Sequence, residues 1–353
     1  MLQNIDNIYE NDYNKNVNKQ NRFGKGVVIY MYSINDIARI TGYAKSSVSA
    51  AINNKPGVSE ATRKKILEVC KELNYTPNEI AKSISNGSSK TIGIIVRDIT
   101  NPFYAKLCRA VEKICEANGY TTLIFNTDGK EDRLKNAIRQ AVGRRVDGVI
   151  LDVSSHNENA IKNLDHHNIK TVIFGLQSEN YDSVSCDDIE GSYDLIKSVS
   201  MEKANKIAYF CPSFNRNIYS KRRYEGISKY ISQNPECELE VVDFKGSSSI
   251  ENGYNLMNNY LKSDKKLPNV IMAFNDLIAV GVIRCLQEHK IKVPEDIIVT
   301  GFDNLETILF PLDTVDIPVY NMGIKATELL FKRLKNPEKE LEHIVLDAKI
   351  VLR

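Results

Sequence analysis

Apolar residues in the first quarter of the chain recur at the spacing of short helices. The first apolar stripe covers 34–40 and stops at Thr41-Gly42, a pair that ends helices. A second stripe covers 45–53, and a third helix is expected to begin after Ser59, because serine commonly caps helix starts. The pattern predicts three helices joined by short turns.

Two features of these helices indicate DNA binding. Ser33 and Asp36 form a capping box at the first helix, because each side chain can bond the backbone N–H of the other residue. The second helix presents small polar and basic side chains on its outer face, among them Lys45 and Ser46. Two helices joined by a tight turn, the second with such a face, are typical of a helix-turn-helix, so DNA is the first partner to consider.

From residue 91 onward, short apolar runs alternate with amphipathic segments. Continuous apolar strands between helices are typical of parallel sheets covered on both faces, and eight such runs divide naturally into two sheets. We therefore expect an α/β, doubly wound core of two lobes, with a ligand cleft at the carboxyl ends of the strands. The expected strands are 91–96, 120–125, 148–153, 171–174, 206–210, 240–244, 269–274 and 297–302, and the expected helices include 104–118, 189–202, 219–232, 250–262 and 276–289.

Two segments lack the pattern of a packed domain. Residues 78–90 have weak helix potential that ends at Asn86-Gly87, and so short a helix needs stabilisation from outside. Residues 1–30 are rich in Asn and have little apolar periodicity. We expect this extension to be disordered or to precede the true start of translation, for which Met31 is the candidate.

The distribution of charge supports contact with DNA without establishing it. The net charge of the 353 residues is +2. Residues 31–90 hold nine Lys/Arg against five Asp/Glu, a balance of +4, whereas residues 91–353 sum to −3. Positive charge is thus concentrated where phosphate would be met, although a solvated helix face gives the same pattern.

Composition and motif content argue against several other classes of function. No apolar run reaches the roughly 18 residues of a membrane span, and the N-terminus lacks the pattern of a secretory signal, so we expect a cytoplasmic protein without membrane contact. Seven cysteines without a Cys-x-x-Cys pair indicate reduced thiols. The histidines lack metal-ligand spacing, and no phosphate-binding loop or nucleophile elbow is present, so we expect no enzyme, cofactor or metal site.

Several motifs, taken in order, resemble those of the LacI/GalR family of bacterial transcription regulators. The resemblance runs from about Met31 to Arg353 and rests on SINDIARITG, SSVSAAINN, VSEATRKKILEVCKELNYTPN, IGIIVRDITNPFY, RRVDGVIL and VTGFDN. It implies a helix-turn-helix domain, a hinge and a core like that of periplasmic binding proteins. It also implies a homodimer that binds palindromic double-stranded DNA and responds to a small molecule in the core.

The resemblance also implies the domain limits. The helix-turn-helix domain is expected at 31–77, the hinge at 78–90 and the core at 91–353. Within the core, Asp187-Asp188 is expected to mark a crossing between lobes. The N-lobe is then expected at 91–187 and 318–336, and the C-lobe at 188–317 and 337–353.

The DNA contacts of the family fall on named positions of this chain. Lys45 and Ser46 lie where recognition-helix side chains read base edges in the major groove. Ile84 matches the hinge residue that enters the minor groove and kinks the duplex, with ordinary packing as the alternative. The family contacts the DNA backbone at the positions of Ser47, Asn53, Ser59 and Asn78, and Ser33, Ala50 and Ala81 complete the expected set.

Polar and aromatic residues near strand ends are the candidates for the effector site. Asp303 lies where a carboxylate can accept two ligand hydroxyls, with capping of a following helix as the alternative, and Arg223 offers a planar fork of donors. Such groups beside an aromatic face suit a sugar or similar molecule. Asn217 and Ile317 stand where family members carry Arg and Gln, which disfavours an anionic ligand. The expected set is Phe103, Tyr104, Asn217, Arg223, Asn275 and Asp303.

The function expected is a sequence-specific transcriptional regulator, a repressor controlled by a saccharide-like effector. Ligand in the cleft would change the angle between lobes and hence the spacing of the two hinges in the dimer, which fold on DNA only when correctly spaced. Two alternatives remain: control by a partner protein, and a sugar-binding protein without a DNA role. The helix-turn-helix counts against the second.

Two departures from the family pattern lead to a prediction. Ala44 replaces the usual serine cap of the recognition helix, a loss of about 1 kcal/mol. Ala50 stands where most members carry a base-reading arginine, a contact of roughly 1–3 kcal/mol. We expect DNA selected from a random pool to depart from the family consensus at the base pair facing Ala50. Recovery of the ordinary consensus with full stringency would contradict this.

Overall fold

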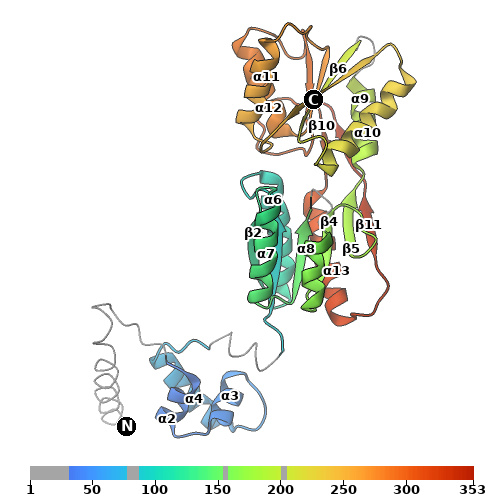
Figure 1. Cartoon of the computed structure of the whole chain (residues 1–353). Coiled ribbons are helices and arrows are strands. Elements are labelled where there is room, and N and C mark those ends of the chain that lie inside the picture. The colour runs from blue at the N-terminus through green and yellow to red at the C-terminus, as the bar shows by residue number, and fades with distance from the viewer. Residues whose placement is uncertain (1–31, 78–86, 154–157, 200–204) are drawn as a thin grey trace. The chain divides into compact units, whose positions relative to one another are not determined.

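The computed structural model describes residues 32–77, 87–153, 158–199 and 205–353, which belong to two compact units divided after Gly87 (Figure 1). The first unit contains the helices α2 (Ile34–Thr41), α3 (Lys45–Ile52) and α4 (Glu60–Glu72). Their apolar faces meet in one small core, so the expected three-helix arrangement is confirmed. The core residues are Ile37, Val48, Ala51, Ile66 and Cys70.

The helix starts in this unit follow the sequence-based expectation. Ser33 and Asp36 form the capping box of α2: the Ser33 N–H donates to the Asp36 carboxylate at 2.9 Å, and the Asp36 N–H donates to Ser33 Oγ at 3.3 Å. Ser59 accepts from the Thr62 N–H and caps α4. Ala44 makes no side-chain cap on α3, as expected.

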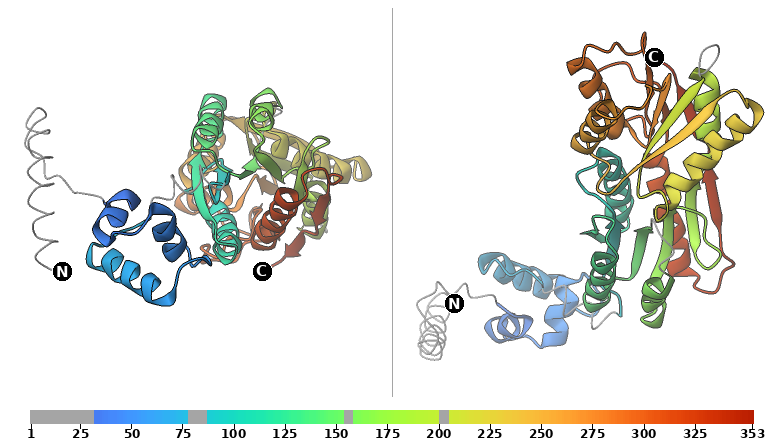
Figure 2. Two further views of the ribbon diagram at one scale, coloured as in Figure 1. Left: turned by 90° about the horizontal axis from the view of Figure 1, so that it is seen from below. Right: turned by 45° about the horizontal axis from the view of Figure 1, so that its top comes forward.

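The N-lobe of the second unit is a six-stranded parallel sheet with the order β11-β5-β4-β3-β1-β2. Helices α6 and α13 cover one face, and α7 and α8 cover the other (Figures 1 and 2). The strands are β1 (Thr91–Val96), β2 (Thr121–Asn126), β3 (Gly148–Asp152), β4 (Lys170–Gly175), β5 (Asp182–Cys186) and β11 (His343–Leu346); the helices are α6 (Pro102–Ala117), α7 (Glu131–Gly143), α8 (Glu158–His166) and α13 (Val319–Lys335).

The C-lobe is a four-stranded parallel sheet with the order β7-β6-β8-β9, beside an antiparallel pair of β10 and β12. Helices α9 and α10 pack together, as do α11 and α12. The strands are β6 (Lys206–Pro212), β7 (Glu238–Phe244), β8 (Val270–Ala273), β9 (Ile298–Thr300), β10 (Thr314–Asp316) and β12 (Lys349–Val351); the helices are α9 (Asp188–Val199), α10 (Ile218–Gln233), α11 (Ile250–Leu261) and α12 (Asp276–Glu288).

All eight expected strands are present, with ends that differ by up to two residues. Four further strands, β5, β10, β11 and β12, were not expected. The sequence of β5, DSVSC, is polar, yet all five residues are buried. Its polar groups find partners inside the protein, since Asp182 bonds Arg333 and Ser183 Oγ lies 2.9 Å from His343 Nδ1. Because its polar groups are hydrogen-bonded within the protein, β5 can be buried without an apolar sequence. The pattern of apolar residues therefore could not predict it.

One expected boundary is wrong. The chain crosses between lobes after β5, as Asp187-Asp188 predicts, and again between β10 and α13. Residues 337–353 were assigned to the C-lobe, but β11 adds to the N-lobe sheet beside β5 and only β12 lies in the C-lobe. The Asp182 carboxylate accepts from the Glu342 N–H at 2.8 Å and from Arg333, and this holds the segment at the sheet edge. The third crossing therefore falls between Leu346 and Lys349.

Among the helices of the described residues, none combines the length and apolar character needed to span a bilayer.

Candidate effector cleft and DNA-contacting helices

A cavity of about 1380 Å³ lies between the two lobes at the carboxyl ends of their strands. All six residues predicted for the effector site line it, and so does Ile317. The loops after parallel strands converge at one edge of each sheet, so residues far apart in the chain meet here.

Arg223 of α10 lines the cavity from the C-lobe side. Its Nε donates to Asp188 at 3.1 Å, a terminal nitrogen lies 3.8 Å from Asp303, and the other donates to the Phe274 carbonyl. The guanidinium also lies over the rings of Phe274 and Phe302, at 4.5 and 3.6 Å from their centres. Much of the Arg223 guanidinium, which was expected to donate to a ligand, thus contacts groups of the protein itself.

Asp303 is buried in a strained backbone conformation. Its φ of 113° is rare for a residue other than glycine, and such strain is concentrated at functional sites. Burial raises the pKa of its carboxyl to about 8, although Arg223 opposes the shift. Residues 304–313 form no helix, so the alternative that Asp303 caps one is wrong.

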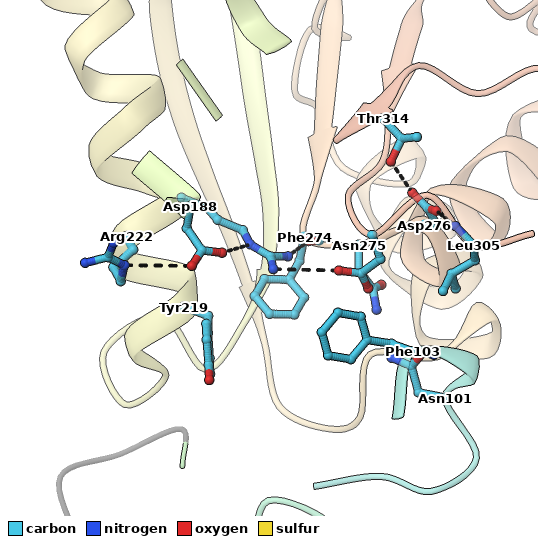
Figure 3. Close-up of polar contacts among 12 residues, drawn as sticks. Asn101, Phe103, Asp188, Tyr219, Arg222, Phe274, Asn275, Asp276, Leu305 and Thr314 are labelled. Atoms are coloured by element: carbon cyan, nitrogen blue, oxygen red, sulfur yellow. Dashed lines mark hydrogen bonds and ion pairs between the residues drawn. The ribbon is translucent and has the colours of Figure 1, made fainter. Parts of the chain in front are cut away.

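The neighbouring carboxylate of Asp276 fixes the loop that carries Asp303. Asp276 accepts from the Leu305 N–H at 2.7 Å and from the Thr314 hydroxyl at 2.6 Å (Figure 3). Burial raises its pKa to about 6, and these hydrogen bonds oppose the shift. Asp276, at the start of α12, thus holds the loop at Leu305 and restrains the segment that carries Asp303.

The two asparagines of the expected set are helix caps. Asn275 Oδ1 accepts from the Ile278 N–H at 3.0 Å and starts α12. Asn217 Oδ1 accepts from the Tyr219 N–H at 3.0 Å and starts α10. Both still line the cavity, so each fixes a helix whose amino-terminal end faces the cleft.

The two predicted aromatic residues differ in what they offer. Phe103, near the start of α6, is partly exposed and packs edge-on against Phe174 with ring centres 6.3 Å apart. Tyr104 is buried, and its hydroxyl donates to Asp152 at 2.5 Å and accepts from Arg97 Nε at 3.1 Å. Phe103 therefore provides the aromatic face, while Tyr104 belongs to a polar network.

Several residues that line the cavity were not predicted from the sequence, although two of them are polar residues at strand ends, the same feature that was used to predict Asn275. Arg97 follows β1 and Asp152 ends β3, so the rule that pointed to Asn275 also applies to them. Arg216 lines the cavity beside Asn217, which weakens the argument that Asn217 made against an anionic ligand. Tyr219 has no signal in the sequence, because its role depends on which way the start of α10 points.

The ionisable groups that line the cavity are mostly acidic. Seven carboxyls stand against four basic groups, so the lining has an excess of acidic side chains. The partly buried Arg97 and the buried Arg223 each lie beside carboxylates. The acidic residues are Asp98, Asp128, Glu131, Asp132, Asp152, Asp188 and Asp303, and the basic ones are Arg97, Lys130, Arg216 and Arg223.

In the first unit, the predicted recognition residues lie at the amino-terminal end of α3. Lys45 and Ser46 are exposed there; Ser47 follows directly and Ala50 lies about one turn further along α3, and both are partly buried. Asn53 is exposed at the carboxyl end of α3, and Ser33 and Ser59 are exposed at the starts of α2 and α4. Asn78, Ala81 and Ile84 lie outside the described residues, as does the extension 1–30.

Arg63 has a structural role that could not be predicted from the charge pattern. Its guanidinium donates to the carbonyls of Ala50, Ala51 and Lys55 at 3.2, 3.0 and 2.8 Å. Ala50 and Ala51 lie in the last turn of α3, where carbonyls have no partner further along the helix, and Lys55 lies in the turn that follows it. Arg63 therefore joins α4 to α3 and does not belong to the positive charge available for phosphate.

Both units match one family of known proteins. Residues 33–78 match "Bacterial regulatory proteins, lacI family", and residues 89–349 match "Periplasmic binding proteins and sugar binding domain of LacI family". The chain is 30% identical over 330 residues to the HTH-type transcriptional repressor PurR of Mannheimia succiniciproducens, covering 92% of this chain and 98% of the relative.

Two solved structures extend the comparison. A lac repressor dimer bound to operator and an anti-inducer has a TM-score of 0.79 at 20% identity over 92% of this chain and 98% of its own, which shows the fold. A LacI family regulator from Enterococcus faecium with bound ribose has a TM-score of 0.65 at 28% identity over 74% and 97%. These relatives are regulators, which confirms the expectation that the protein is not an enzyme. The chain belongs to the LacI family of bacterial regulatory proteins.

Proposed function

We propose that this regulator is a cytoplasmic repressor that binds a palindromic operator as a homodimer and changes its affinity when a neutral polyhydroxylated molecule, such as a sugar, binds between the lobes. The observation that carries the DNA role is the exposed amino-terminal end of α3, with Lys45 and Ser46, in a unit that matches the LacI family. Side chains at this end of a recognition helix reach base edges in the major groove.

The chemistry of the cavity supports a neutral effector. Phosphate or carboxylate ligands need uncompensated positive charge. The lining here is mostly acidic, and both the partly buried Arg97 and the buried Arg223 lie beside carboxylates. The partly exposed Phe103 offers a stacking face, and Asp303 offers oxygens to ligand hydroxyls. Ribose is bound by the related Enterococcus faecium regulator.

Exposed apolar side chains support self-association. Leu309 is 95% exposed on the loop after β9, and Ile124 on the edge strand β2 is 48% exposed. Single exposed apolar side chains are common on protein surfaces, and we propose these two as contacts between the copies. With the hinge proposed at 78–90, the two copies would place two recognition helices on the two halves of a palindrome.

The DNA role is tested by retardation of DNA selected from a random pool. We expect affinity to fall steeply as salt rises, because phosphate contacts release counterions. Lys45→Ala is expected to cost about 1–3 kcal/mol in binding the selected sequence. Lys71→Ala, an exposed lysine on the last turn of α4, is the matched control and should change little. Binding that is indifferent to salt and to Lys45 would refute the proposal.

The effector role is tested at Asp303. We expect Asp303→Ala to abolish the response of DNA binding to a sugar, while affinity for DNA without effector is retained. Asp303→Asn controls for backbone strain, because asparagine tolerates positive φ better than alanine. Asp264→Ala, an exposed carboxylate of the C-lobe, should have no effect. Loss of DNA binding in the Asp303 variants would contradict a purely ligand-binding role.

The choice of effector is tested by thermal shift with ribose, cellobiose, a sugar phosphate and neutral nucleobases. A shift with a neutral sugar that disappears in Asp303→Asn supports the proposal. A shift confined to the sugar phosphate would overturn the argument from charge, and one confined to nucleobases would replace the sugar with a flat heterocycle.

The raised pKa of Asp303 gives a prediction for stability. Between its ordinary pKa of 3.8 and about 8, the folded protein holds a proton that the unfolded chain has released. The free energy of unfolding therefore falls as pH rises through this window. We expect the melting temperature of the core to decline less steeply from pH 5 to pH 8 in Asp303→Asn than in the unsubstituted protein. Equal slopes would contradict the assignment.

A further inference from the structure

Tyr219 crosses the cleft from the C-lobe to the N-lobe. It lies in the first turn of α10, and its hydroxyl donates to Asp152 Oδ1 at 2.8 Å. Asp152 is the last residue of β3 in the N-lobe. Figure 3 shows the Tyr219 hydroxyl directed away from Asp188 and the other polar groups of the C-lobe.

Both oxygens of the Asp152 carboxylate have partners within the protein itself. Oδ1 accepts from Tyr219, and Oδ2 accepts from Tyr104 at 2.5 Å and lies 3.5 Å from the Arg97 guanidinium. The Arg97 guanidinium also lies 5.0 Å from the centre of the Tyr219 ring. A hydroxyl from one lobe thus completes the hydrogen bonding of a buried carboxylate in the other.

The N-lobe is shaped to receive the tyrosine. Gly175, the last residue of β4, has a φ of 90°, and a Cβ there would lie 2.2 Å from the Tyr219 hydroxyl. Any other residue would be strained and would also displace the hydroxyl. On the C-lobe side, the Asn217 cap holds the backbone N–H of Tyr219 and fixes the start of α10.

An ion pair also joins the two lobes, and it is weaker than the Tyr219 hydrogen bond. Lys106 of α6 lies 3.0 Å from Glu306 of the loop after β9, but the side chains are 31% and 83% exposed. Solvent screens such a pair, which contributes little. Tyr219 and Asp152 are both buried, so breaking their hydrogen bond leaves a desolvated carboxylate without one of its donors.

We propose that the Tyr219 hydroxyl occupies the position at Asp152 that a ligand hydroxyl would otherwise take. This contact holds the two lobes together when no effector is bound. The consequence for ligands rests on the proposed function: an effector reaches Asp152 only by displacing Tyr219. Burial raises the pKa of the Tyr219 hydroxyl well above its usual range, so it remains a donor at neutral pH.

The distance between the lobes tests this directly in the full chain without any ligand. All seven cysteines are buried, so spin labels can be directed to Lys162→Cys in α8 and Asp264→Cys after α11, both exposed. We expect one narrow distance distribution in the otherwise unsubstituted protein. Tyr219→Phe removes the hydroxyl alone, and should increase the population at a different, open distance by about tenfold.

Two further variants make the result decisive. Tyr254→Phe removes a tyrosine–carboxylate hydrogen bond of 2.5 Å to Glu288 within the C-lobe and should leave the distribution unchanged. Gly175→Ala should open the cleft by a different route, by displacing the hydroxyl. A Tyr219→Phe distribution that overlays the unsubstituted one, or an equal change in Tyr254→Phe, overturns the proposal. Because no ligand is added, failure to find a sugar effector has no bearing on this outcome.

Discussion

The buried guanidinium of Arg223 is the interaction on which the cleft of this regulator depends. A charge removed from water is tolerated only when other groups replace its hydration. Here the replacement comes from Asp188 at the start of α9, Asp303 after β9, and the carbonyl and ring of Phe274 after β8. Arg223 itself comes from α10, so one side chain draws together four segments that are distant in the sequence. The polar floor of the cavity is the result.

The sequence carried enough information to predict the fold class, the eight central strands and the location of the site. Strand runs such as TIGIIV are apolar because both faces of a parallel sheet are covered, and the polar residue after each run then lies at the cleft edge. Asp303 and Asn275 could be predicted for this reason. Ser33 and Ser59 were predictable because caps act within one turn of their own helix.

The sequence did not reveal which strands and side chains contact each other when they are far apart along the chain. The edge strand β11 alternates in exposure and pairs with the polar strand β5, so neither shows the apolar run of a central strand. Arg223 looked like a donor for a ligand, but three of its contacts are internal. Tyr219 looked like any helix residue, because nothing local reports that its hydroxyl reaches Asp152 in the other lobe.

The position of Arg63 has a consequence for how this DNA-binding unit is studied by mutation. Its three donated hydrogen bonds hold the end of α3 against α4. Replacing it would loosen the orientation of the recognition helix and lower operator affinity, although its guanidinium is bonded to carbonyls of the protein. An alanine scan of basic residues would therefore record Arg63 as a DNA contact. A melting curve of the same variant separates the two roles, because a surface phosphate contact can be lost without loss of stability.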